Sequence, residues 1–169
     1  MPIVLARVDE RLTHGQVMTS PALATLKING IVIADGAVCQ DPLTQAIYNA
    51  SIQSADYDIK FGNHYTPPED LLSFLRSVDR EKRRFLVLFR DLSSVLLAIQ
   101  KGVILSELNL GNFTSRHPEK KALTRGFQVG PTESEELKKL HWLIGFLYFN
   151  DLGSKGLPYS PLKHAWENV

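Results

Sequence analysis

The length and composition of the chain place it among compact globular proteins. Its 169 residues fit a single domain, and the 44% hydrophobic and 22% charged residues are close to the globular average, which excludes a largely disordered chain. The 19 Lys and Arg against 18 Asp and Glu leave a net charge of +1, too small to indicate nucleic acid or anionic lipid as the main partner. We therefore expect no nucleic-acid partner.

Cysteine content and apolar runs bear on the compartment. The single cysteine, Cys39, excludes an intrachain disulfide and any zinc site built from several cysteines. The longest apolar run, 142–149, is far shorter than the roughly 18–20 residues of a membrane span, and the N-terminus has no signal-peptide pattern. These features predict a soluble, cytoplasmic protein without a membrane span of its own.

Apolar segments alternate with amphipathic ones along the first two thirds of the chain. Strand patterns, rich in Val, Ile, Leu and Phe, cover residues 2–8, 29–35, 57–62, 84–90 and 105–110. Helix patterns, with apolar residues three and four apart, cover residues 16–26, 42–51, 67–78 and 92–101. This alternation is typical of βαβ units. We expect an α/β fold with an open, doubly wound, mainly parallel sheet and helices on both faces.

The last third of the chain is less regular. Its pattern predicts a strand at 122–129, a helix at 131–140 and a final strand at 145–150. From about residue 151 the chain carries several glycines and prolines, which suggests a tail that wraps the surface. Because no repeat or linker interrupts the sequence, we expect residues 1–169 to form one domain that ends in this tail.

The segment after the first predicted strand combines residues suited to anion chemistry. In open α/β sheets, ligands bind where the carboxyl ends of strands meet helix N-termini, and such N-termini favour anions. Arg11 could grip a phosphoryl group, Gly15 would let the backbone approach it, and His14 could attack phosphorus through a ring nitrogen. Asp9 or Asp35 could orient that ring. The alternative is that His14 only caps or packs against the loop.

Residues 7–17, with the sequence RVDERLTHGQV, resemble the active-site loop of one protein family. The pattern R-[IV]-D-x-R-L-[IV]-H-G-Q-V occurs in IIB subunits of the mannose/fructose/sorbose family of the bacterial phosphoenolpyruvate-dependent sugar phosphotransferase system. Three later segments also resemble the family: its second strand and next helix, its fourth strand, and its I-N-V-G-[GN] turn. They are IVIAD at 31–35 with DPL at 41–43, LVLFR at 86–90, and LNLGN at 108–112. The resemblance runs in order over residues 3 to about 140.

The resemblance implies a phosphocarrier that needs no cofactor. In this family the IIB histidine accepts a phosphoryl group from a phosphohistidine on the IIA partner and passes it to a sugar held by the membrane subunits IIC and IID. Such a chain is a protein-phosphohistidine–sugar phosphotransferase, peripheral at the membrane through IIC and IID. By resemblance, His14 carries the phosphoryl group, Arg11 and the backbone of Gly15 and Gln16 hold it, and Asp9 is the nearby carboxylate. Asp35 and Asn109 are expected to support them.

The chain also departs from the family pattern. Thr13 replaces an aliphatic residue, Gly36 stands where a second aspartate is common, and Ser20 with Pro21 occupies the region of a usual tryptophan. The sequence from Trp142 onward does not follow the family's usual ending. The alternative function is therefore a regulatory phosphoprotein, or a binding module of the same fold, without transfer to sugar.

The remaining candidates favour structural roles. Cys39 is interpreted as a structural thiol in a loop, and Asp35 as a hydrogen-bonding loop residue instead of a phospho-acceptor. The scattered histidines lack the spacing of metal ligands, so we expect no metal site; they are His64, His141 and His164. A basic cluster after the Asn109 turn is interpreted as a solvated loop, with a docking surface as the alternative; it comprises Arg116, His117, Lys120, Lys121 and Arg125. Late aromatic residues are expected to pack in the core: Trp142, Phe146, Tyr148 and Phe149.

Overall fold

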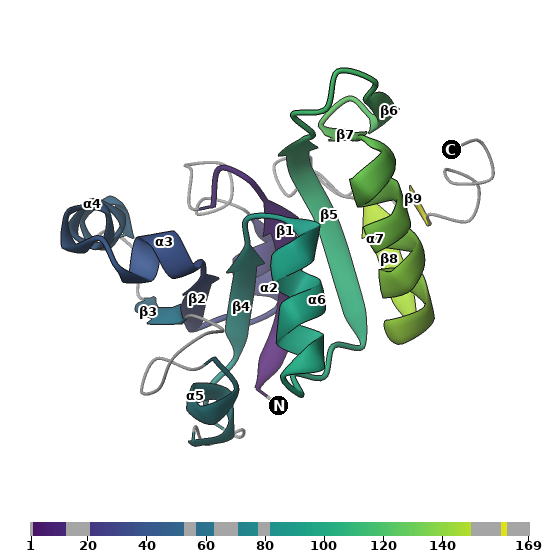
Figure 1. Ribbon diagram of the computed structural model, residues 1–169. Helices are drawn as coiled ribbons and strands as arrows, with labels where there is room; N and C mark the ends of the chain where they lie inside the picture. The colour runs from purple at the N-terminus through teal and green to yellow at the C-terminus, as the bar shows by residue number, and fades with distance from the viewer. Residues whose placement is uncertain are drawn as a thin grey trace.

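A parallel sheet forms the centre of the computed structural model, which describes residues 2–12, 21–52, 57–62, 71–77, 82–149 and 160–161 (Figure 1). Five parallel strands lie in the order β3-β2-β4-β1-β5. Their bounds are β1 (Ile3–Asp9), β2 (Gly30–Ala34), β3 (Asp58–Gly62), β4 (Phe85–Phe89) and β5 (Glu107–Thr114). All five were predicted from the sequence, and the predicted mainly parallel sheet is confirmed.

Continuous apolar sequences account for the central strands. Every residue of β2 (GIVIA) and β4 (FLVLF) is buried, as expected for parallel strands covered on both faces. The edge strand β3 (DIKFG) is only partly buried and carries charged residues. Charges on an edge strand discourage pairing with another chain.

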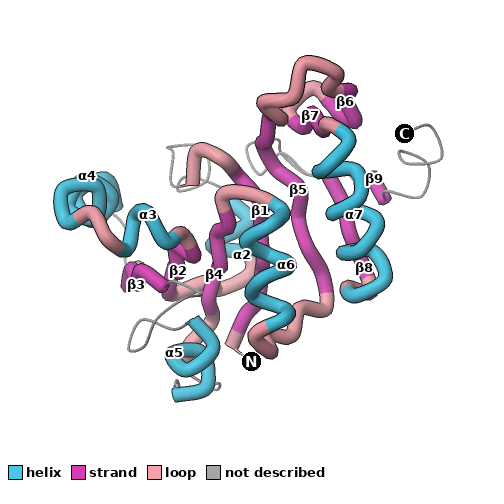
Figure 2. Tube along the Cα trace, in the orientation of Figure 1, coloured by secondary structure: helices cyan, strands magenta, loops and turns pink. Residues whose placement is uncertain are grey.

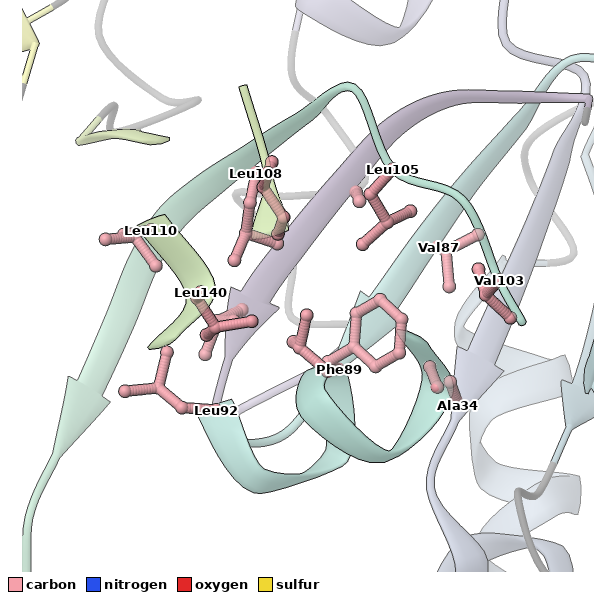
Figure 3. Close-up of a cluster of buried hydrophobic side chains, with 14 of the residues drawn as sticks. Ala34, Val87, Phe89, Leu92, Val103, Leu105, Leu108, Leu110 and Leu140 are labelled. Atoms are coloured by element: carbon pink, nitrogen blue, oxygen red, sulfur yellow. The ribbon is translucent and has the colours of Figure 1, made fainter. Parts of the chain in front are cut away.

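Helices cover both faces of the sheet (Figure 2). They are α2 (Pro21–Thr25), α3 (Gly36–Cys39), α4 (Pro42–Ile52), α5 (Leu71–Ser77), α6 (Leu92–Gln100) and α7 (Pro131–Leu143). One core cluster joins the sheet to α5, α6 and α7, and Figure 3 shows part of it, with Phe89 of β4, Leu92 of α6 and Leu140 of α7. The second cluster packs Leu23 of α2 and Val38 of α3 against the opposite face. The doubly wound, single-domain architecture is therefore as predicted.

The C-terminal third extends the sheet beyond β5. Strand β8 (Phe146–Phe149) pairs in parallel with the first half of β5, and β7 (Phe127–Val129) pairs with its end. Strand β6 (Lys121–Thr124) forms an antiparallel hairpin with β7, and β9 (Ser160–Pro161) pairs with β8. Among the helices in the described part of the chain, none is long and apolar enough to cross a membrane.

Several local predictions were wrong in this third. The single strand expected at 122–129 is the β6–β7 hairpin, because the chain reverses between Thr124 and Phe127. The Asn109 turn is not a turn, since 109–112 lie within β5. The short strand β9 had no pattern that predicted it. Outside this third, the helix α3 was taken for a loop.

The late aromatic residues divide between core and surface. Tyr148 is 4% exposed, as predicted, whereas Trp142 is 87% exposed and Phe146 is 38% exposed. Helix α7 buries Leu137 and Leu140, and Trp142 lies two residues beyond Leu140. Two residues of an α-helix span about 200°, so Trp142 points to the side opposite the buried stripe. The predicted core position of Trp142 was therefore wrong, and so was that of Phe146, whose side chain is also exposed.

Candidate active site

The order of the strands brings polar residues together at the carboxyl edge of the sheet. Strands β2, β4, β1 and β5 are consecutive neighbours in this sheet. Asp35 follows β2, Arg90 follows β4, and Asp9 is the last residue of β1. Because parallel strands end at the same edge, these residues lie where open α/β sheets bind their ligands.

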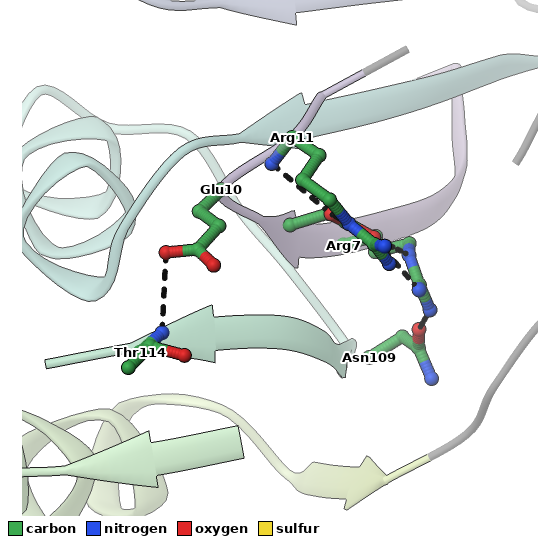
Figure 4. A network of polar contacts seen from close by, with 6 residues as sticks. Arg7, Glu10, Arg11, Asn109 and Thr114 are labelled. Carbon is green, nitrogen blue, oxygen red and sulfur yellow. Dashed lines mark hydrogen bonds and ion pairs between the residues drawn. The ribbon is translucent and has the colours of Figure 1, made fainter. Parts of the chain in front are cut away.

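Asp9 is the centre of a polar network at the end of β1. Figure 4 shows the Arg7, Arg11 and Asn109 side chains of this network. The wholly buried Asp9 carboxylate accepts hydrogen bonds on Oδ2 from Arg7 Nη2 at 2.9 Å and from Arg7 Nε at 3.2 Å. Its other oxygen, Oδ1, accepts from the Arg11 backbone N–H at 3.2 Å and lies 3.6 Å from Arg11 Nε. One carboxylate therefore binds two guanidinium groups, which leaves an excess positive charge on the three side chains.

Arg11 combines this anchor with access to solvent. Its side chain is 48% exposed, whereas the Asp9 side chain is fully buried. The Asp9 contact engages Nε, and the two Nη nitrogens of Arg11 have no hydrogen-bond or ion-pair partner among the described residues. A guanidinium whose outer nitrogens remain available can bind an anion with two parallel hydrogen bonds.

Arg7 is the first of two residues that sequence reasoning missed. It lies in the middle of β1, is 2% exposed, and donates from Nη1 to Asn109 Oδ1 on β5 as well as to Asp9. The side chain fits because β5 has a glycine beside it: a Cβ atom on Gly111 would lie 2.0 Å from Arg7 Cζ. The available signal was a charged residue in an otherwise apolar strand, since a buried charge requires partners.

The chain turns sharply after Asp9. The Leu12 N–H donates to the Asp9 carbonyl at 2.9 Å, and Leu12 has φ 50°, a left-handed conformation that a leucine rarely adopts. The Leu12 side chain is fully buried in the second core cluster, which holds the turn in place. This turn leads directly into residues 13–20, which lie outside the described residues. The roles expected for His14, Gly15 and Gln16 therefore stay predictions.

Asp35 has a different environment. Its Oδ1 accepts from the Val38 N–H at 2.9 Å and caps α3, and its Oδ2 accepts from Arg90 Nε. Burial lowers the pKa of Arg90, but the hydrogen bond and charge of Asp35 outweigh this and raise it above its usual value. Asp35 thus holds Arg90, a second residue that sequence reasoning missed. The orientation of His14 by Asp9 or Asp35 stays a prediction.

Asn109 joins β5 to this edge. It is fully buried, accepts from Arg7, and is paired in register with Arg7 on β1 and Tyr148 on β8. Its Nδ2 is buried and has no hydrogen-bond partner among the described residues. The amide oxygen of Asn109 thus holds one nitrogen of Arg7, and the supporting role expected for Asn109 stays a prediction.

The other candidates lie away from this network. Cys39 ends α3 and is partly buried. The basic cluster lies on the β5–β6 connection and the hairpin, where His117 Nδ1 accepts from the Glu119 N–H at 3.1 Å. No group of three or more His, Cys, Asp or Glu side chains in the described ranges is arranged to hold a metal ion. The described part of the site thus comprises Arg7, Asp9, Arg11 and Asn109.

Known proteins are similar to this chain in sequence and in fold. The model of the family described as PTS system sorbose subfamily IIB component matches residues 3–145. The chain is 27% identical over 140 residues to the PTS system sorbose-specific EIIB component of Klebsiella pneumoniae, covering 83% of this chain and 81% of that protein. It is also 27% identical over 110 residues to the N-acetylgalactosamine-specific phosphotransferase enzyme IIB component 1 of Escherichia coli, covering 65% and 66%.

Solved structures agree on the fold. The IIBSor domain of the sorbose permease from Klebsiella pneumoniae matches with a TM-score of 0.80 and 24% sequence identity, over 99% of this chain and 97% of that one. The family match covers β1 to α7, ends just before β8, and includes the whole described network. The chain therefore belongs to the sorbose subfamily of phosphotransferase-system IIB components, which are transferases of sugar phosphotransfer.

Proposed function

We propose that the chain is a phosphocarrier in which His14 accepts a phosphoryl group from phosphohistidine on a IIA partner. The group then passes to a sugar bound by the membrane subunits IIC and IID during uptake. The observation that carries this proposal is the Asp9–Arg11 pair at the carboxyl end of β1, with Arg11 three residues before His14, in a chain of the IIB family. The chain acts in the cytoplasm and meets the membrane only through IIC and IID.

The charge of the network suits a phosphoryl group. Two guanidinium groups share one carboxylate, and only Arg11 of the two reaches solvent. In phosphoryl transfer the protein mainly orients the reactants and stabilises charge on the equatorial oxygens. The Nη nitrogens of Arg11 supply such donors, and the backbone N–H groups of Gly15 and Gln16 supply others.

The transfer itself needs one nucleophilic nitrogen. The lone pair of a neutral His14 ring nitrogen attacks phosphorus as the nitrogen–phosphorus bond of the IIA phosphohistidine breaks. In the second step a sugar hydroxyl oxygen attacks the same phosphorus and releases its proton to water, and the His14 nitrogen leaves with its bonding pair. No cofactor takes part in either step.

The first step can be tested by intact-mass analysis. The chain is incubated with phosphoenolpyruvate, the general relay proteins and the cognate IIA. We expect one acid-labile phosphoryl group on the parent chain and none on His14→Ala. The matched control is His141→Ala, an exposed histidine at the end of α7, which should be phosphorylated like the parent. An unphosphorylated parent beside a phosphorylated IIA would refute the proposal.

The second step separates the carrier from a regulatory phosphoprotein of the same fold. Phosphorylated chain is added to vesicles that contain the matching IIC and IID, with either sorbose or N-acetylgalactosamine, the sugars in the names of the two relatives. Formation of a sugar phosphate, absent with His14→Ala, supports the carrier. Phosphorylation without transfer to any sugar taken up by those subunits would favour the regulatory alternative.

A further inference from the structure

We propose that Arg7 is a positioning residue, which orients Arg11 through Asp9 and depends on Gly111 for its own place. The expected effect of Arg7 on the rate of phosphoryl transfer rests on the proposed function. Its structural part, the control of Arg11 by Arg7, stands on the described geometry alone (Figure 4).

Burial excludes direct contact between Arg7 and a phosphoryl group from a partner protein. Arg7 is 2% exposed, and all three nitrogens of its guanidinium are engaged, two with Asp9 and one with Asn109. Arg11, on the same carboxylate, is 48% exposed. Arg7 therefore acts on the site only through the groups that it holds.

The two oxygens of the Asp9 carboxylate bind different arginines. Oδ2 receives both Arg7 bonds, and a fork of two donors on one oxygen together with the strand backbone sets the plane of the carboxylate. The orientation of that plane decides where Oδ1 lies, and Oδ1 holds both the backbone N–H and the Nε of Arg11. Lysine, with a single ammonium group, cannot reproduce the fork.

Gly111 of β5 provides the space that the Arg7 guanidinium occupies. An added Cβ would lie 2.0 Å from Arg7 Cζ and 2.1 Å from Nη2, so the guanidinium lies directly over the β5 backbone. Any larger residue at this position would displace the guanidinium from Asp9. Arg7 thereby links the last residue of β1 to the middle of β5, with Asn109 fixing its remaining nitrogen.

The positioning part is tested by NMR without any phosphoryl transfer. The Arg11 backbone amide and Nε–H signals, assigned by their loss or shift in Arg11→Lys, are compared in the parent and in Arg7→Lys. We expect the protected amide of the parent to exchange at least about tenfold faster in Arg7→Lys, because Oδ1 no longer holds it. Unchanged Arg11 signals in a folded Arg7→Lys chain would overturn the inference.

A double-mutant cycle tests the consequence for transfer. At saturating phosphorylated IIA, Arg7→Lys should slow phosphorylation of the chain by about 10-fold to 100-fold with little change in the IIA concentration for half-maximal rate. In an Arg11→Met background the same substitution should change the rate by less than about twofold, since its effect passes through Arg11. Equal slowing in both backgrounds would show a merely structural role and overturn the inference.

A second variant covers the case in which Arg7→Lys does not fold. Gly111→Ala retains every charge and should show the same Arg11 signal change and the same dependence on Arg11. Its control is Gly145→Ala, where the nearest atom to an added Cβ is the Ser106 carbonyl oxygen at 3.5 Å, an ordinary contact. If the parent is not phosphorylated by IIA, the proposed function fails while the NMR result still decides the positioning role.

Discussion

Asp9 and Asp35 occupy equivalent places in the sheet but hold arginines that differ in their exposure to solvent. Each stands at the carboxyl end of a buried parallel strand, β1 or β2, with β4 between them. Asp9 is fully buried between two arginines, whereas Asp35 caps a helix and holds the half-exposed Arg90. Both carboxylates are buried, but Arg7 is buried with Asp9, whereas Arg90 reaches solvent and can be hydrated if its partner is lost.

The largest expected effect comes from removing the buried carboxylate. Asp9→Ala leaves the Arg7 guanidinium buried without its counter-charge, and breaking such a buried pair costs about 3–5 kcal/mol. Urea unfolding of the variant and the parent measures the difference. A loss under about 1 kcal/mol would show that Arg7 finds water or another partner, and the contrast with Asp35 would disappear.

A smaller effect is expected at the β1–β5 contact. Gly111→Ala forces the Arg7 guanidinium to move and should lower the free energy of unfolding by about 1–3 kcal/mol, the usual cost of overpacking. The measurement compares the melting temperatures of Gly111→Ala and Gly145→Ala. Because Gly145→Ala adds the same methyl group at an ordinary contact distance, the difference reports the clash with Arg7. Equal melting temperatures for the two variants would contradict the close fit.

Asp35→Ala should cost less than Asp9→Ala. It removes the cap of α3 and the partner of a half-exposed arginine, together about 1–2 kcal/mol. Asp41→Ala, which removes an exposed carboxylate bonded to the Leu43 and Thr44 N–H groups, is the matched cap control. If Asp35→Ala destabilises as strongly as Asp9→Ala, the proposed difference between the two sites is wrong.

The smallest effect concerns pH and a carboxylate far from the site. Burial raises the pKa of Glu107, at the start of β5. The folded state therefore binds this proton more tightly than the unfolded state, and the resulting stability is present below the unfolded pKa of about 4.3 and is lost as pH rises through the folded pKa. Glu107→Gln should gain stability relative to the parent across that window. Denaturant unfolding from pH 3.5 to 7 measures it, and a pH-independent difference would contradict it.

The strands and the site differ in how far sequence alone predicts them. The strands β2 and β4 were predicted because an unbroken apolar run suits a strand buried on both faces. Asp9 and Arg11 were predicted together because they are two residues apart and one turn joins them. Arg7–Asn109 and Arg90–Asp35 were missed because their partners lie 102 and 55 residues apart in the chain.

The surface positions show the same limit. Trp142 looked like a core residue from its composition, and only the docking of α7 through Leu137 and Leu140 turned it to solvent. The hairpin of β6 and β7 depends on β5 continuing to Thr114, where Phe127 packs against Phe113 with ring centroids 5.5 Å apart. Neither arrangement has a local pattern that predicts it.

The sequence by itself determined the alternation of strands and helices, the loop that follows β1 and the family to which that loop points, because periodicity and short motifs are local properties. Only the tertiary structure decided that Arg7 lies under Asp9, that Gly111 gives it room and that Arg90 binds Asp35. The physical reason is burial: a charged side chain inside a protein must find its partners in space, and the order of the strands determines which partners are within reach.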